Sequence, residues 1–145
     1  MDRRQFLASG AAFGASTLAA SHGLAQGKPL KIGILNDLST IYADYQGVGS
    51  KIAADMAIAD WSAKLGVPAE TIISDHQNKP DIGSGIARKW IDQEGVDVIM
   101  DLPGSPVALA VLAVANEKNK AVIASAAGSS LMTGPQCSKK FVHWT

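Results

Sequence analysis

The chain has 145 residues, enough for one domain, and its 13 basic and 13 acidic side chains leave no net charge at pH 7. A neutral chain without a basic run is a poor partner for nucleic acid, so that class of function is disfavoured. Hydrophobic residues make up 47% of the sequence, which is enough to build a real core.

The first 25 residues have the pattern of an export signal. Arg3 and Arg4 form a basic start, residues 6–20 are apolar with many small side chains, and residues 23–25 offer a cleavage site. The arginine pair resembles the twin-arginine export motif incompletely, so the twin-arginine and Sec routes both stay open. The apolar stretch is too short to span a bilayer stably. We therefore predict that residues 1–25 are a cleaved signal peptide and that the protein is periplasmic.

The first predicted strand covers residues 31–36 (KIGILN), a nearly continuous apolar run that is typical of a parallel strand covered on both faces. A loop over residues 37–43 follows, and then a helix over residues 44–64, ended by Gly66 and Pro68. Apolar side chains recur in this helix every three or four residues, so we expect their face to pack on the sheet. They are Tyr45, Val48, Ile52, Met56, Ala59 and Ala63.

Two more strand and helix units follow, and then a fourth strand. In the second unit a polar loop leads to a helix capped by Asp81 or a neighbour and ended by Gly95. The helix of the third unit is apolar almost all round, which predicts burial. The predicted strands are residues 70–74, 96–100 and 121–124, the last predicted helix is residues 107–118, and a further strand begins at Phe141.

This alternation predicts an α/β fold with a parallel sheet and helices on both faces. Ligands bind such sheets beyond the carboxyl ends of the strands. Strands 96–100 and 121–124 are joined by a short crossover helix, so they should be neighbours whose loops meet at one rim. The candidate site is therefore formed by the loops at residues 37–43, 75–79, 101–105 and 125–130.

Several kinds of chemistry lack their motifs in this sequence. The fingerprints of dinucleotide binding, of the P-loop and of the nucleophile elbow are missing, and His76 and His143 have no metal-ligand spacing. We predict no cofactor and no metal. Asp37, Asp75 and Asp101 follow strands, where turn and capping roles are favoured over a phosphoryl-transfer cluster.

The strand-end loops instead offer uncharged hydrogen-bond donors. Ser105, Ser125, Ser129 and nearby N–H groups can hold a carboxylate at the positive end of a helix dipole. Tyr42 either covers the apolar part of the ligand or packs on the sheet edge. Donors without a nucleophile and base indicate binding, not turnover, so we expect no enzyme. The single Cys137 either pairs with a cysteine beyond this chain or is a free buried thiol.

The segments KIGILNDLSTIYADYQGVGSKIAADMAI, SDHQNKPDIGSGIARKWIDQEGVDVIMDLPGSPVALAV and NKAVIASAAGSSLMTGPQCSKKFVHWT resemble the first lobe of ABC-transporter substrate-binding proteins of the leucine-binding type. The resemblance implies a type I periplasmic-binding fold, in which two lobes hold a small organic ligand between them. It assigns ligand contacts to Ser105 and to a small-residue loop. That loop is Ala126, Ala127, Gly128 and Ser129, where the family commonly has Ala-Ala-Thr and either Gly128 or Ser129 replaces the threonine.

The resemblance also implies a role and partners. The protein would be the solute-binding component of an ABC importer that captures an amino acid, an amide or an aromatic acid and delivers it to membrane permease subunits. Residues 28–145 would form an incomplete first lobe, with the second lobe absent. Two other functions stay open: an exported α/β hydrolase that uses Asp37, Asp101 or Ser105, and the ligand-sensing domain of a receptor.

Overall fold

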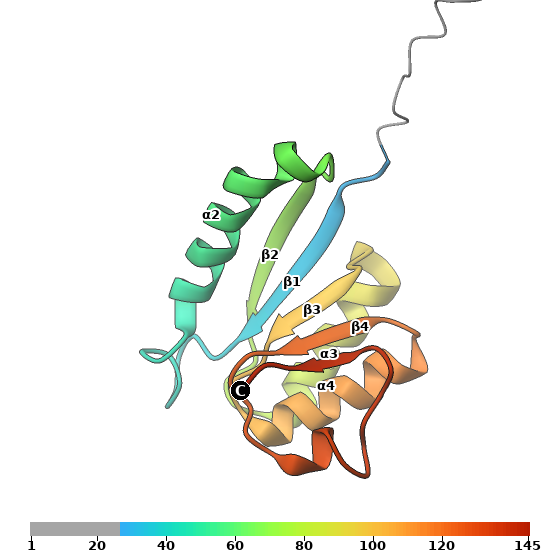
Figure 1. The fold of residues 1–145 in the computed structure, drawn as a ribbon. Coiled ribbons are helices and arrows are strands. Elements are labelled where there is room, and N and C mark those ends of the chain that lie inside the picture. The colour runs from blue at the N-terminus through green and yellow to red at the C-terminus, as the bar shows by residue number, and fades with distance from the viewer. Residues whose placement is uncertain (1–26) are drawn as a thin grey trace, which may run out of the picture.

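A computed structural model describes residues 27–145, so the predicted signal peptide lies outside the described residues. The described chain forms one five-stranded parallel sheet in the order β2-β1-β3-β4-β5, with helices on both faces (Figure 1). The α/β class predicted from the alternation of elements is confirmed. The predicted strand ends agree with the observed ones within two residues.

The elements follow one another in the predicted order. They are β1 (Leu30–Asn36), α2 (Gly47–Leu65), β2 (Ala69–Asp75), α3 (Pro80–Lys89), the π-helical turn η1 (Trp90–Glu94), β3 (Val98–Asp101), α4 (Ser105–Glu117), β4 (Ala121–Ala124), the short 3-10 helix η2 (Ser130–Met132) and β5 (Phe141–His143). Gly66 and Gly95 adopt the left-handed conformation where α2 and η1 end, as the sequence predicts. No side chain caps α3, so the expected cap at Asp81 is wrong; Pro80 begins the helix instead.

The register aligns the ends of the five strands along one edge of the sheet. Asn36 pairs with Asp75 on one side of β1, while Asp101 pairs with Leu35 of β1 and with Ala124 of β4. Since all strands are parallel, the loops that leave them start side by side, and in Figure 1 the arrowheads of β1, β3 and β4 converge on this edge.

The hydrophobic core lies between the sheet and the helices α3 and α4. Leu35 and Ile99 from the sheet meet Val107 and Val111 of α4 there, all with no exposed surface. Close packing needs glycine at two points of this face. A Cβ on Gly33 would lie 2.6 Å from the ring of Trp90, and the equivalent contact at Gly83 is described below.

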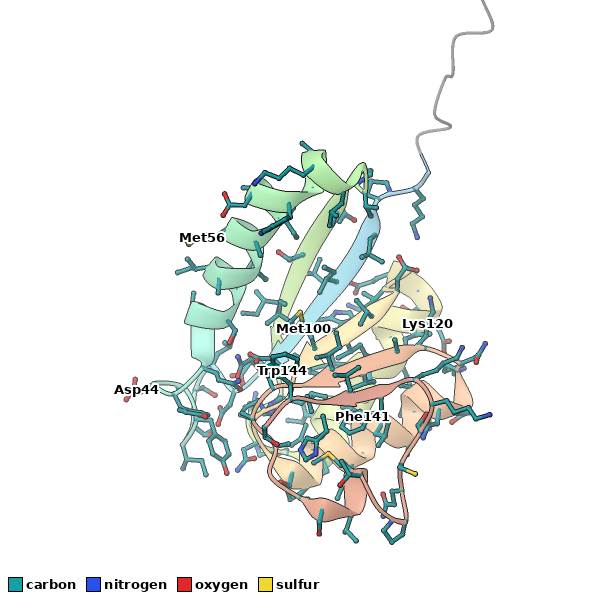
Figure 2. All side chains as sticks on the ribbon, in the orientation of Figure 1. Asp44, Met56, Met100, Lys120, Phe141 and Trp144 are labelled. Atoms are coloured by element: carbon teal, nitrogen blue, oxygen red, sulfur yellow. The ribbon has the colours of Figure 1, made fainter. Side chains whose placement is uncertain are left out.

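Helix α2 covers the other face, but with a different side from the one predicted. Tyr45, Val48, Ile52 and Met56 are 56–69% exposed, and Figure 2 shows Met56 on the side of α2 away from the sheet. The side toward the sheet carries Ala54, Ile58, Trp61 and Leu65, and it leaves an apolar groove of about 320 Å³ over β1 and β2. Both sides of α2 are apolar, so periodicity alone could not identify the buried one.

Three further observations concern the described residues as a whole. Within residues 27–145 no helix is both long enough and apolar enough to cross a membrane. No group of three or more His, Cys, Asp or Glu side chains in this range could hold a metal ion. Cys137 is exposed, so the alternative of a buried free thiol is wrong.

Candidate ligand site at the carboxyl edge of the sheet

The loops after β3 and β4 leave the same edge of the sheet, because these strands are parallel neighbours. The predicted meeting of the two loops is therefore confirmed. A hydrogen bond of 3.0 Å from the N–H of Ser125 to the carbonyl of Asp101 joins the loops where they begin. Whatever binds at this edge meets both loops together.

The first loop ends at the N-terminus of α4, which begins at Ser105, two residues earlier than predicted. Gly104 precedes the helix and no side chain caps it, while Pro106 sets the backbone of the first turn. The first N–H groups of a helix have no partner within it, so this end of α4 offers donors to a ligand. Ser105 is half-buried, and no histidine among the described residues is hydrogen-bonded to it.

Two other loops approach the start of α4. A Cβ on Gly104 would overlap the side-chain oxygen of Asn78 and would lie 3.7 Å from Cε2 of Tyr42. The half-buried ring of Tyr42 is thus beside the loop that leads to Ser105, which brings together two residues that the sequence analysis named. Only glycine fits between these side chains without displacing them.

The second loop, residues 125–130, is held at several points. Ala127 is fully buried and its carbonyl contacts Nε2 of His143 in β5. The hydroxyl oxygen of Ser129 accepts a hydrogen bond of 3.3 Å from the N–H of Leu131 and so caps η2. Ala126 is half-buried and Gly128 is exposed. Of the predicted loop residues, Ala126, Gly128 and Ser129 reach the surface.

Two aspartates at this edge stabilise turns, as the sequence predicts. Asp37 accepts hydrogen bonds from the N–H groups of Ser39, Thr40 and Tyr42 and from the hydroxyl of Thr40. Burial acts to raise the pKa of Asp37, but these hydrogen bonds outweigh it and the pKa lies below its ordinary value. The carboxylate is therefore ionised at neutral pH.

Asp75 does the same for the next loop. Its carboxylate accepts hydrogen bonds from the N–H groups of Leu38 and Gln77 and from the hydroxyl of Ser39. Burial acts to raise the pKa of Asp75, yet the hydrogen bonds lower it below the ordinary value overall. Residues from the loops after β1 and β2 are thereby tied together.

Asp101, by contrast, joins side chains from three other segments. Its carboxylate contacts Asn36, Gln46 and Ser125, and the amide of Gln46 also donates to the hydroxyl of Ser125 at 3.0 Å. We call these four residues the Asp101 network. The backbone φ angle of Asp101 is 91°, a value that residues other than glycine rarely adopt.

His76 is a buried histidine with one unsatisfied nitrogen. The ring has no exposed surface, Nδ1 accepts a hydrogen bond of 2.9 Å from the N–H of Asn78, and Nε2 has no partner among the described residues. Burial lowers the pKa of His76, and the charges of Asp37, Asp75 and Asp101 offset this only in part. The ring is therefore neutral at pH 7, with its proton on Nε2.

The sequence analysis named the loops but missed several of the residues that join them. Asn36 and Gln46 were not considered, and Asp101 was read as a turn residue like Asp37. One signal was present: Asn36 is a buried amide at the end of an apolar strand, and such a group needs hydrogen-bond partners. The identity of those partners depends on the sheet order, which no local pattern contains.

The chain is similar to a known protein family and to several solved structures. A family model described as periplasmic binding protein matches residues 29–145. A periplasmic binding protein from Burkholderia mallei is 41% identical, with a TM-score of 0.75 over 79% of this chain and 31% of that chain. No curated protein matches.

Two further solved structures are similar. A branched chain amino acid ABC transporter periplasmic ligand-binding protein from Burkholderia xenovorans is 35% identical, with a TM-score of 0.72 over 78% of this chain and 32% of that chain. An ABC transporter solute binding protein from R. palustris, in complex with 4-hydroxybenzoate, is 25% identical, with a TM-score of 0.70 over 80% of this chain and 31% of that chain. The chain thus spans about a third of the length of these relatives.

Proposed function

The chain belongs to the periplasmic binding protein family, and from this premise we propose that it is the solute-binding component of an ABC importer. It captures a small organic ligand between the lobe described above and a second lobe, and it delivers the ligand to permease subunits in the membrane. The relatives are ABC transporter proteins, which supports this role. The protein binds its ligand without chemical turnover, and no cofactor takes part.

The edge of the sheet at α4 is the proposed ligand contact. The uncapped start of α4 and the hydroxyl of Ser105 offer donors to a carboxylate, and the helix dipole adds about 0.3 to 1 kcal/mol. Tyr42 covers the apolar part of the ligand. The ligand loop, residues 126–129 after β4, completes the contact with Ala126, Gly128 and Ser129, while the fully buried Ala127 holds the loop against β5. The single observation that carries this proposal is that the loops after β3 and β4 meet beside the bare start of α4.

The proposed ligand is a small organic molecule: an amino acid, an amide or an aromatic acid. Micromolar affinity needs about 8 kcal/mol, which calls for burial of most of the ligand and hence for a second surface over this open edge. One relative is in complex with 4-hydroxybenzoate, and another belongs to a branched chain amino acid ABC transporter. The first probes to test are therefore 4-hydroxybenzoate and a branched-chain amino acid such as leucine.

The first prediction concerns Ser105. In the protein with both lobes, we expect Ser105→Ala to weaken binding of leucine or of 4-hydroxybenzoate by about 10-fold or more, because a hydrogen bond to a charged group contributes about 1.5 to 3 kcal/mol. Isothermal titration calorimetry measures the change. Ser84→Ala is the matched control, since this serine donates to its own helix backbone in α3. Equal affinities for the two variants would remove Ser105 from the site.

The proposed location is the periplasm, reached with the aid of the signal peptide at residues 1–25. Replacing Arg3 and Arg4 with lysine distinguishes the export routes, because the twin-arginine receptor reads the arginine pair whereas Sec needs only positive charge. Mass spectrometry of the periplasmic fraction then reports whether residues 1–25 are removed. Retention of the unprocessed chain in the cytoplasm of wild-type cells would contradict periplasmic action.

A further inference from the structure

We propose that Asp101 and Gln46 are positioning residues, which hold the ligand loop after β4 in place against the strand ends. The inference deepens the proposed function and rests on it, because it assumes that residues 126–129 contact the ligand. The proposal is based on the contacts inside the Asp101 network. They link the segment before α2 to the loop after β4 through a single buried carboxylate.

At Oδ1 of Asp101 the hydrogen bonds of the network form a closed ring. Oδ1 of Asp101 accepts hydrogen bonds from Nε2 of Gln46, at 2.7 Å, and from the hydroxyl of Ser125, while Gln46 donates to that hydroxyl as well. These three groups form a triangle of hydrogen bonds. Oδ2 of Asp101 accepts from the side-chain amide of Asn36, which also donates to the carbonyl of Gly47 at 3.1 Å.

Burial makes these contacts energetically important. Asp101 is 4% exposed, and it takes part in no ion pair with another described residue. A buried carboxylate without a cation depends on hydrogen-bond donors, and removing one leaves the charge under-solvated. The hydrogen bonds that Gln46 and Ser125 donate to Asp101 therefore stabilise both residues in their positions.

The backbone of Asp101 adds a second hold on the same loop. Its carbonyl accepts the N–H of Ser125 while its carboxylate accepts the hydroxyl of the same residue. Ser125 directly precedes Ala126, so the residue at which the ligand loop begins to leave β4 is held by two hydrogen bonds. The φ angle of 91° at Asp101 is strained, and such strain persists where surrounding contacts enforce it.

The substitution Gln46→Glu tests this positioning role because it replaces the donating amide of Gln46 by a carboxylate of nearly the same shape. At pH 8 the new carboxylate would face that of Asp101, and like charges at this distance cannot both stay buried. At lower pH the pair shares one proton, which restores a donor between the two groups. The disturbance caused by Gln46→Glu should therefore decrease as the pH falls.

The double variant Gln46→Glu/Asp101→Asn reverses the polarity of the triangle. The amide introduced at position 101 donates to the carboxylate at position 46 and to the hydroxyl of Ser125, whose own proton turns to the carboxylate. The remaining oxygen at position 101 still accepts from Asn36. Every hydrogen bond of the triangle is kept with reversed direction and the bond from Asn36 is unchanged, so this variant should rescue the single one.

Hydrogen exchange of the ligand-free protein gives the readout. We expect the amide of Ser125, which donates to the carbonyl of Asp101, to exchange about 10-fold faster than in the wild type in Gln46→Glu at pH 8, as for the loss of a hydrogen bond to a charged group. The ratio to wild type should shrink at pH 5, and the double variant should restore the wild-type rate. Gln77→Glu adds the same charge at the same edge without touching Asp101, and it should leave this loop unchanged.

Two results would overturn the inference: unchanged exchange of the Ser125 amide in Gln46→Glu, or an equal increase in the central strands β1 and β3, which would indicate general destabilisation. Titration with 4-hydroxybenzoate and with leucine separates this inference from the proposed function. If the wild type binds neither probe while the exchange pattern holds, the choice of ligand class fails and the positioning role stands. If binding is intact in Gln46→Glu, the positioning role fails and the proposed function stands.

Discussion

His76 couples the stability of this protein to pH. Burial lowers its pKa below 6.5, the ordinary value, so the unfolded chain takes up a proton at a higher pH than the folded protein does. The free energy of unfolding is therefore at its full value above a pH of about 6.5 and decreases as the pH falls from there towards the pKa of the folded state. The slope from this one group is at most about 1.4 kcal/mol per pH unit.

The prediction is that His76→Asn flattens this dependence. The oxygen of the new amide replaces Nδ1 as acceptor for the N–H of Asn78, and the amide itself does not titrate. Urea unfolding at pH 7 and at pH 5 measures the difference. An identical loss of stability in wild type and variant would show that His76 does not titrate in this window.

Asp37 and Asp75 act in a separate, more acidic window. Hydrogen bonds hold their pKa values below the ordinary value of 3.8 against the opposing effect of burial, so their contribution is present above about pH 4 and is lost as the pH falls further. Their turn roles could be predicted from sequence, because each bonds to N–H groups within a few residues or in one neighbouring loop. The network of Asp101 could not, since its partners are 24 to 65 positions away.

The packing of α3 on α4 depends on a glycine at the contact. A Cβ on Gly83 would lie 2.6 Å from Cγ1 of Val107 and 3.6 Å from Cβ of His76. We expect Gly83→Ala to destabilise the protein by about 1 to 3 kcal/mol through overpacking, measured by thermal or urea unfolding.

Gly85→Ala is the matched control in the same helix. No atom lies within 4 Å of the Cβ position at Gly85, so the substitution only improves helix propensity, by up to about 1 kcal/mol. Opposite signs for the two variants are expected. A Gly83→Ala variant as stable as Gly85→Ala would mean that α4 shifts freely and that the contact is not tight.

For the helices, the sequence patterns predicted which segments are helical better than they predicted which side of each helix is buried. Helix α4 is apolar almost all round and is buried as expected, whereas α2 is apolar on both sides and the wrong side was assigned to the sheet. The side chosen carries large residues such as Ile52 and Met56, but the side toward the sheet also carries large ones, Trp61 and Leu65, beside small ones such as Ala54. Apolar residues of both sizes occur on both sides of α2, so the periodicity of the sequence does not distinguish the side that faces the sheet.

For the whole molecule, the position of a strand in the sheet predicts how well its amides are protected. β1 and β3 each lie between two strands, whereas β5 is a short edge strand in which Val142 is 47% exposed. We expect amides in β1 and β3 to exchange at least about 100-fold more slowly than those in β5, because local opening requires less free energy at an edge. Comparable rates in β5 and β3 would contradict this order of stability.

The overall architecture was predictable because it follows from a repeated local unit. Each strand and crossover helix is encoded within about 30 residues, and the right-handed crossover leaves few ways to arrange successive units in one sheet. The strand order β2-β1-β3 and the residues that it brings together at the edge arise only when the units assemble. The fold class was therefore accessible from the sequence, whereas the contacts between loops were not.

The alignment of all strand ends on a single edge has an evolutionary consequence. The polar groups there bond mainly to one another, while the tight contacts of Gly33 with Trp90 and of Gly83 with Val107 lie between the sheet and the helices of the core. Mutations at the exposed groups of the proposed ligand site are thus separated from those that would disturb the core. Under the proposed function, a lineage built on this scaffold can diversify in the ligand it binds while its folding stability stays under independent selection.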